Sequence, residues 1–125
     1  LTQLQHSKGL VFPVRWHEPF GLAIIESLYF GAPVFGTPYG SLPELVNEDL
    51  GFLSNSSTKL SEAMEHYQDY NPKTCHDYAA THFSAESMTK GYLEFYEKVI
   101  QGDYLNSNTP QKIAEEKSKF LEWLK

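Results

Sequence analysis

Two glutamates, Glu18 and Glu26, are the residues whose type and spacing first suggest chemistry. They bracket an apolar stretch, PFGLAII, and a carboxylate on the buried side of a helix is costly unless it has a partner. Eight helical positions span about 12 Å, so the two groups are too far apart to share a proton. Because a carboxylate accepts hydrogen bonds well from two adjacent hydroxyls of a sugar or ribose, we predict that the glutamates hold the two ends of one elongated ligand.

The elements that must position these glutamates follow a strand–helix–strand order. Three short apolar runs are typical of buried strands: residues 9–14, 32–37 and 51–54. Between the first two runs we expect a helix whose first residue is Pro19 and which Gly31 ends, and a short helix opens near residues 41–43. This order predicts a parallel sheet that is covered on both faces.

The rest of the chain is predicted to be mostly helical. Asn71 and Ser84 are typical N-caps, and apolar residues recur at helical spacing before and after them. The aromatic stripe of the helix that follows Ser84 is expected to pack in a core; it consists of Tyr92, Phe95 and Tyr96. After a loop at residues 102–108, Thr109-Pro110 is expected to open a last amphipathic helix.

A ligand of an open α/β sheet binds beyond the carboxyl ends of the strands, and Glu18 follows the first predicted strand. We expect Pro19, Phe20 and Gly21 to form the first helical turn, whose free N–H groups and positive dipole end favour an anion. Gly21 has no side chain, so a ligand can approach the backbone closely. The predicted ligand has two polyol ends and an anionic centre, and a nucleotide-diphosphate sugar fits that description.

Composition excludes several other classes of protein. The chain has 125 residues, with 10 Lys and Arg against 16 Asp and Glu, and the resulting net charge of -6 argues against nucleic-acid binding and a polybasic membrane patch. The single cysteine, Cys75, permits no internal disulfide and indicates a reducing, cytoplasmic location. Cys75, His76 and His82 lack the spacing of metal ligands, so no metal is predicted. The chain starts with neither a Met nor an apolar signal segment, and we expect a fragment of a longer protein.

The stretch from Glu18 to Glu26, EPFGLAIIE, resembles the E-x7-E motif of the family 4 retaining glycosyltransferases, which have the GT-B fold. Its surroundings resemble the same family in order, namely the strands and helices of residues 11–46, the strand GFLS and the closing helix FSAESMTKGYLEFYEKV. Residues 11–46 include a G-G-x-P-E element ending at Pro43-Glu44, and we align Tyr39 with its first glycine. The resemblance extends from Leu10 to Ile100.

The resemblance implies a Rossmann-like, three-layer α/β/α fold with a short parallel sheet, equal to half of a GT-B carboxyl-terminal domain, plus C-terminal helices. Residues 1–108 would form a partial donor-binding domain. Residues 109–125 would form an amphipathic helix that packs on this body or on a missing domain. The implied activity is transfer of a sugar from a nucleotide-diphosphate sugar to an acceptor with retention of configuration, without a metal or a resident cofactor.

The resemblance also implies roles for individual residues. Glu18 would contact donor sugar hydroxyls near the reacting carbon, and Glu26 would hold the ribose hydroxyls. The main-chain amides of Phe20, Gly21 and Leu22 would meet sugar hydroxyls or phosphate. Three further residues are candidates for ligand contact: Arg15, His17 and Gly40. Simple surface placement is the favoured reading of Arg15 and His17, and an ordinary turn explains Gly40 as well as a ligand contact does.

Parts of the family's pattern are absent from this sequence. The amino-terminal acceptor domain is missing, and so is the first half of the donor domain, which supplies an Arg and a Lys to the diphosphate. We therefore expect little or no transferase activity from this chain alone. The open sheet edge and the uncovered apolar surface predict either a homodimer or partial exposure of that surface. Two other functions stay open: a non-catalytic module that binds a nucleotide or sugar nucleotide, and an interaction domain whose site is vestigial.

Overall fold

The computed structural model describes residues 3–106, 108–111 and 120–125. Three parallel strands form one sheet, in the order β1 (Leu10–Phe12), β2 (Val34–Gly36) and β3 (Gly51–Leu53). The helices are α1 (Leu22–Tyr29), α2 (Leu42–Leu45), α3 (Ser57–Glu65), α4 (Pro72–His82) and α5 (Ala85–Ile100), with 3-10 turns at Leu4–His6 and Tyr67–Asp69.

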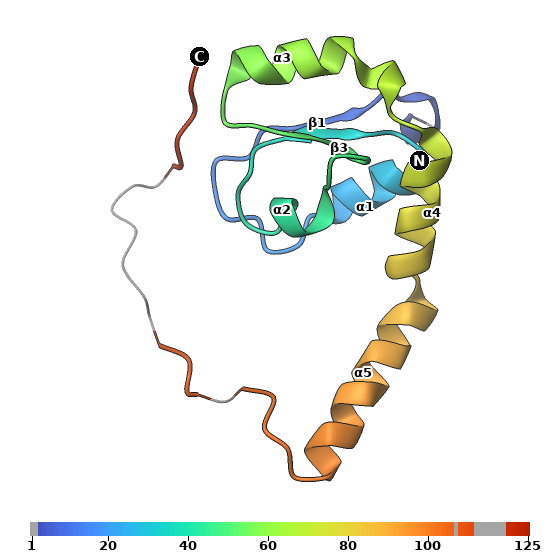
Figure 1. Cartoon of the computed structure of the whole chain (residues 1–125), viewed down its shortest axis with the longest axis vertical. Helices are drawn as coiled ribbons and strands as arrows, with labels where there is room; N and C mark the ends of the chain where they lie inside the picture. Colours follow the sequence, from blue (N-terminus) through green and yellow to red (C-terminus); the bar gives the residue numbers. More distant parts are fainter. Residues whose placement is uncertain (1–2, 107, 112–119) are drawn as a thin grey trace.

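The sheet lies between two helical layers. Figure 1 shows α3 on one face of the strands and α1 and α2 on the other, while α4 packs against α1. The register is regular, since Leu10 pairs with Val34 and Val34 pairs with Gly51. The predicted three-layer α/β/α fold with a short parallel sheet is therefore confirmed.

The core lies between α1, the sheet and α4. Ile24 and Leu28 of α1 and Val34 of β2 are fully buried there. Cys75 of α4 is buried in the same cluster, and this burial raises the pKa of its thiol. These contacts fix the orientation of α1, whose first turn borders the end of the sheet where the strands finish.

Helix α1 begins at Leu22 and not at Pro19 as the sequence predicts. Gly21 is the N-cap and has a φ of 88°, a left-handed conformation that glycine adopts without steric cost. Because the chain turns at this point, Pro19 and Phe20 belong to the preceding loop. The separation of about 12 Å expected for the two glutamates assumed a helix that includes both, and this assumption is wrong because Glu18 lies outside α1.

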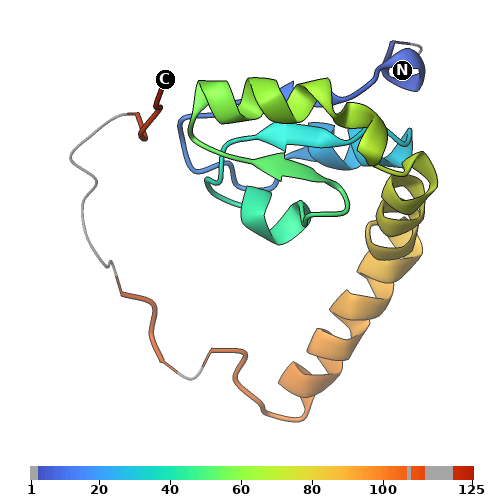
Figure 2. The ribbon, with the colours of Figure 1, turned by 45° about the horizontal axis from the view of Figure 1, so that its top comes forward.

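Helix α5 extends away from the sheet, as Figures 1 and 2 show, and has no buried residue. The predicted cap is present, because Ser84 Oγ accepts a hydrogen bond from Ser87 N at 3.1 Å. The prediction that the aromatic stripe is core is wrong: Tyr92, Phe95 and Tyr96 are 56%, 50% and 57% exposed. Spacing predicts an apolar face but does not say what covers it.

Gly91 provides a test of how stable α5 is by itself. It lies inside the helix, and a Cβ there would have no heavy atom within 4 Å. Gly91→Ala is expected to stabilise α5 by about 0.5–1 kcal/mol, because alanine loses less backbone entropy than glycine. Amide hydrogen exchange of residues 92–96 should slow correspondingly, and unchanged exchange would contradict the description of α5 as a helix with free space beside Gly91.

The last predicted helix falls mainly on residues 112–119, which lie outside the described residues. Residues 109–111 and 120–125 are not helical. Instead, Leu124 forms an isolated parallel bridge with Ser56, the N-cap of α3. In the described part of the chain, no helix has the length and apolar character needed to cross a membrane.

Candidate functional site

The loops that follow the three strands meet at one end of the sheet, which we call the carboxyl edge. They comprise residues 13–21, 37–41 and 54–56. The fully buried Thr37 donates a hydrogen bond from its hydroxyl to Val14 O, which ties the first loop to the second. The loop that carries Glu18 is therefore anchored at its start by the neighbouring strand.

The turn at Gly40 and Ser41 holds the main chain of Glu18. Gly40 has a φ of 61°. A Cβ at Gly40 would lie 2.3 Å from Glu18 N and 2.4 Å from Glu18 O. The Ser41 N–H donates to Glu18 O at 2.9 Å, and Ser41 Oγ donates to Phe20 O at 2.7 Å. Gly40 therefore acts by letting two backbone segments approach closely.

Glu18 is partly buried. Its Oε2 accepts a hydrogen bond from Trp16 Nε1 at 3.1 Å. Neither ion pair between described residues involves Glu18. Because an ionised carboxylate has about four acceptor positions, Glu18 keeps most of its capacity for a hydroxyl-bearing ligand.

The tip of α1 presents main-chain donors. The helix has no side-chain cap and no acidic residue in its first turn. Ile24 N donates to Gly21 O at 2.9 Å, whereas the N–H groups of Leu22 and Ala23 donate to no described residue. Leu22 is 70% exposed, so this tip is open to a ligand. Free donors at the positive end of a helix dipole favour an anion.

Glu26 is exposed on α1 and lines a groove of about 590 Å³ between α1 and α4. Glu18 does not line this groove. The two regions meet through Phe20, whose ring packs edge-on against Phe83 at 6.0 Å between centroids, and Phe83 lines the groove. The Glu26 carboxylate makes no hydrogen bond or ion pair with any described residue, so it is free to accept hydroxyls.

Arg15 faces the C-terminal residues. Its Nε donates to Leu121 O at 2.9 Å, and its guanidinium lies 5.5 Å from the centroid of the Phe120 ring. Arg15, a candidate phosphate contact, is therefore bound to Leu121 and Phe120 in the structure. His17 is exposed in the same loop.

Residues 2–81 match the family model described as glycosyl transferases group 1. The chain belongs to this glycosyltransferase family. The match includes the carboxyl edge and α1, whereas α5 and residues 120–125 lie beyond it.

The glycosyltransferase chain is also similar to a protein of Klebsiella pneumoniae named "Uncharacterized 41.2 kDa protein in cps region". The two are 32% identical over 94 residues, which cover 70% of this chain and 26% of that relative. The chain thus spans about a quarter of the length of this relative.

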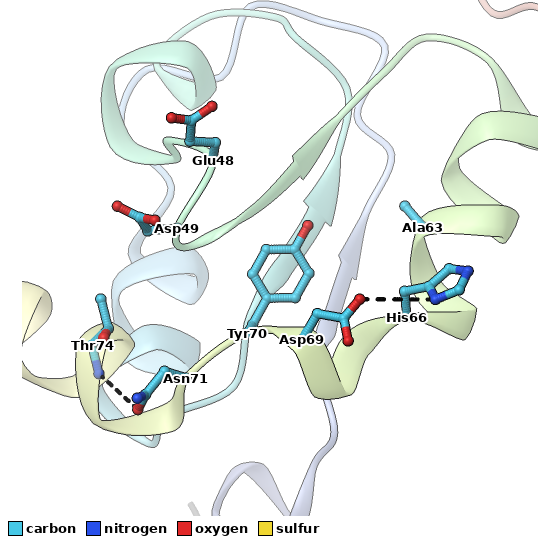
Figure 3. Close-up of a pocket in the computed structure, with 8 residues that line it drawn as sticks. All are labelled: Glu48, Asp49, Ala63, His66, Asp69, Tyr70, Asn71 and Thr74. Atoms are coloured by element: carbon cyan, nitrogen blue, oxygen red, sulfur yellow. Dashed lines mark hydrogen bonds and ion pairs between the residues drawn. The ribbon is translucent and has the colours of Figure 1, made fainter.

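A second cavity of this glycosyltransferase chain, of about 320 Å³, lies near the opposite end of the sheet (Figure 3). Glu48, Asp49 and Asp69 line it, and His66 Nδ1 lies 3.8 Å from Asp69 Oδ2. Three acidic side chains repel a diphosphate. Within the described residues, no three His, Cys, Asp or Glu side chains gather closely enough to hold a metal ion.

Sequence reasoning missed two residues of the carboxyl edge, Trp16 and Ser41. The alignment of Tyr39 with the first glycine of the G-G-x-P-E element is also wrong. Counting back from Pro43-Glu44 places Gly40 and Ser41 at the two glycine positions. Ser41 is therefore the residue that departs from the glycine pattern. No pattern identifies Trp16, because its contact with Glu18 depends on the loop conformation.

Ser41→Ala tests the support that this turn gives to the glycosyltransferase loop. The variant loses the Oγ hydrogen bond to Phe20 O but keeps the N–H bond to Glu18 O. We expect the free energy of unfolding to fall by about 1 kcal/mol, the usual net value of one such hydrogen bond. Urea denaturation measures this loss. An unchanged midpoint would show that the Ser41 hydroxyl does not support the loop.

Proposed function

We propose that the carboxyl edge binds a nucleotide-diphosphate sugar and that the longer protein transfers the sugar to an acceptor with retention of configuration, as a family 4 enzyme. The observation that carries this proposal is the uncapped tip of α1, with Glu18 before it and Glu26 within the helix. A diphosphate is bound well by free N–H groups, and hydroxyl-rich ends are bound well by carboxylates. A nucleotide-diphosphate sugar offers these groups in the same order.

In this proposal each residue of the edge has one role. Glu18 accepts hydrogen bonds from the donor sugar hydroxyls near the reacting carbon, and Trp16 orients its carboxylate. The amides of Phe20, Gly21 and Leu22 meet sugar hydroxyls or phosphate. Glu26 holds the ribose hydroxyls, which would place the nucleoside along the groove between α1 and α4.

Transfer of the sugar leaves negative charge on the departing nucleoside diphosphate. The positive end of α1 stabilises that charge, but preorganised cations are usually needed as well. Arg15 is the cationic side chain nearest to Glu18 in sequence, and it contacts residues 120 and 121. We therefore propose that the isolated chain binds the donor but transfers little or no sugar without the upstream part of the longer protein.

Calorimetric titration tests donor binding. The 125-residue chain is titrated with nucleoside diphosphates, with the corresponding nucleotide sugars and with uncharged nucleosides as a control. We expect saturable binding of the nucleotide sugar that is tighter than binding of the nucleoside. Absence of binding for every nucleotide sugar would contradict the proposal and favour a vestigial site. Sugar transfer by the isolated chain would contradict its proposed inactivity.

The edge of β1 supports a further proposal about partners of the isolated chain. β1 pairs with β2, and Val11 in β1 is 53% exposed. An unpaired edge is a template for another strand, and we propose that two copies of the chain pair there. Light scattering should show a dimer at high protein concentration, and a monomer at every concentration would contradict this pairing.

A further inference from the structure

The described C-terminal residues, 120–125, cross the carboxyl edge without forming a helix. Three main-chain hydrogen bonds hold them: Leu121 N to Arg15 O at 2.9 Å, Leu124 N to Asn55 O at 2.7 Å and Ser57 N to Leu124 O at 2.8 Å. Leu121 thus contacts the loop after β1, and Leu124 contacts the loop after β3 and the start of α3. The segment, which we call the C-terminal strap, spans the edge from one outer strand to the other.

Side chains fix the strap between these two ends. Tyr39 OH, in the loop after β2, donates to Glu122 O at 2.6 Å. Asn55 Nδ2 donates to Glu122 Oε2 at 3.2 Å, and Arg15 Nε donates to Leu121 O at 2.9 Å. Most of these bonds involve main-chain atoms of the strap. All three loops of the carboxyl edge therefore contribute to one peptide-binding surface.

The strap and the proposed donor use the same loops. Arg15 belongs to the loop that carries Glu18, and Tyr39 precedes Gly40, whose close approach positions Glu18. With the strap in place, the Arg15 guanidinium contacts Leu121 O and the Phe120 ring. While the strap is docked, Arg15 is therefore already engaged, and the loop that carries Glu18 is already bonded to the strap, although the α1 tip itself stays open.

We propose that the C-terminal strap competes with the nucleotide sugar for Arg15, so that full donor affinity requires the strap to leave the carboxyl edge. The inference rests on the proposed function, because it concerns the same site. When a binding-competent state is only fractionally populated, the apparent dissociation constant rises by the inverse of that fraction. A strap that is docked nine-tenths of the time weakens donor binding about tenfold.

The first experiment removes the strap. Calorimetry compares the full chain with a chain that ends at residue 119 and with a chain whose residues 120–125 are replaced by six Gly and Ser residues. Both variants are expected to bind the nucleotide sugar about tenfold more tightly than the full chain. Added peptide of the strap sequence, FLEWLK, should weaken donor binding by the shortened chain, whereas a scrambled peptide should not.

The second experiment locks the strap and does not depend on the shortened chain folding. Ser56→Cys with Leu124→Cys joins the two bridge partners, whose spacing in a strand ladder suits a disulfide. The oxidised variant is expected to bind the nucleotide sugar at least tenfold more weakly than its reduced form. The natural Cys75 is buried away from this pair.

The outcomes separate this inference from the proposed function. Equal donor affinity of the full, shortened and locked chains would overturn the competition and leave the donor site standing. Weaker binding by the shortened chain would also overturn it, because the strap would then be part of the site. Absence of donor binding in every form would overturn the proposed function and, with it, the competition.

Discussion

Gly40→Ala is expected to lower the free energy of unfolding by about 2–5 kcal/mol, enough to leave much of the chain unfolded. Two effects add. A non-glycine residue in the left-handed region costs about 1–2 kcal/mol, and Gly40 has a φ of 61°. The new methyl group would also lie 2.3 Å from Glu18 N, so the loop that carries Glu18 must move. Denaturation followed by circular dichroism measures the loss.

Gly102→Ala is the matched control for this prediction. Gly102 has a φ of 92°, but a Cβ there would have no heavy atom within 4 Å. This control carries the conformational cost of about 1–2 kcal/mol without the clash. If the two variants lose the same free energy of unfolding, the close approach of Gly40 to Glu18 contributes nothing, and the account of how Glu18 is positioned is wrong.

Charge removal at the two glutamates is expected to have the second large effect, on donor affinity. Glu26→Gln should weaken binding of a nucleoside diphosphate and of its sugar conjugate equally, because Glu26 is proposed to hold the ribose. Glu18→Gln should weaken binding of the sugar conjugate and leave the nucleoside diphosphate unchanged. Hydrogen bonds to a charged group contribute about 1.5–3 kcal/mol, so each affected dissociation constant should rise about 10- to 150-fold. Calorimetry on the same protein preparations measures both ligands.

Glu62→Gln is the control for these variants, since Glu62 is exposed on α3. It removes the same charge from the chain and is expected to leave both affinities unchanged. Equal weakening by all three substitutions would mean that total charge alone governs binding. Loss of nucleoside diphosphate binding in Glu18→Gln and not in Glu26→Gln would reverse the proposed orientation of the ligand.

The fold could be predicted because its signals are local and repeated. The apolar runs predict β1, β2 and β3, and the caps of two helices are readable directly: Asn71 Oδ1 accepts a hydrogen bond from Lys73 N at 2.9 Å, and Ser84 caps α5. The order of these elements then restricts the sheet to a parallel one. The placement of Glu18 after the first strand and of Glu26 within the first helix follows from the same reasoning, whereas the separation of Glu18 from the start of α1 does not.

Features that depend on backbone conformation or on distant contacts could not be predicted. The start of α1 depends on the left-handed φ of Gly21. Glycine can adopt a helical or a left-handed conformation, so the sequence does not say which one Gly21 has. The hydrogen bond from Ser41 to Phe20 joins residues 21 positions apart. The contact of Arg15 with Leu121 joins residues 106 positions apart, so no periodicity indicates it. Exposure of the aromatic stripe of α5 likewise depends on whether another part of the protein packs against it, which the spacing of the stripe does not indicate.

The position of the bound ligand tests the central claim most directly, and amide chemical shifts of the isotope-labelled chain report it. On titration with a nucleoside diphosphate, we expect the largest shifts at the amides of Phe20, Gly21 and Leu22 and smaller shifts along α1 toward Glu26. Shifts confined to the acidic cavity around Glu48 and Asp69, or absence of saturable shifts at the tip of α1, would contradict the assignment of the carboxyl edge as the donor site.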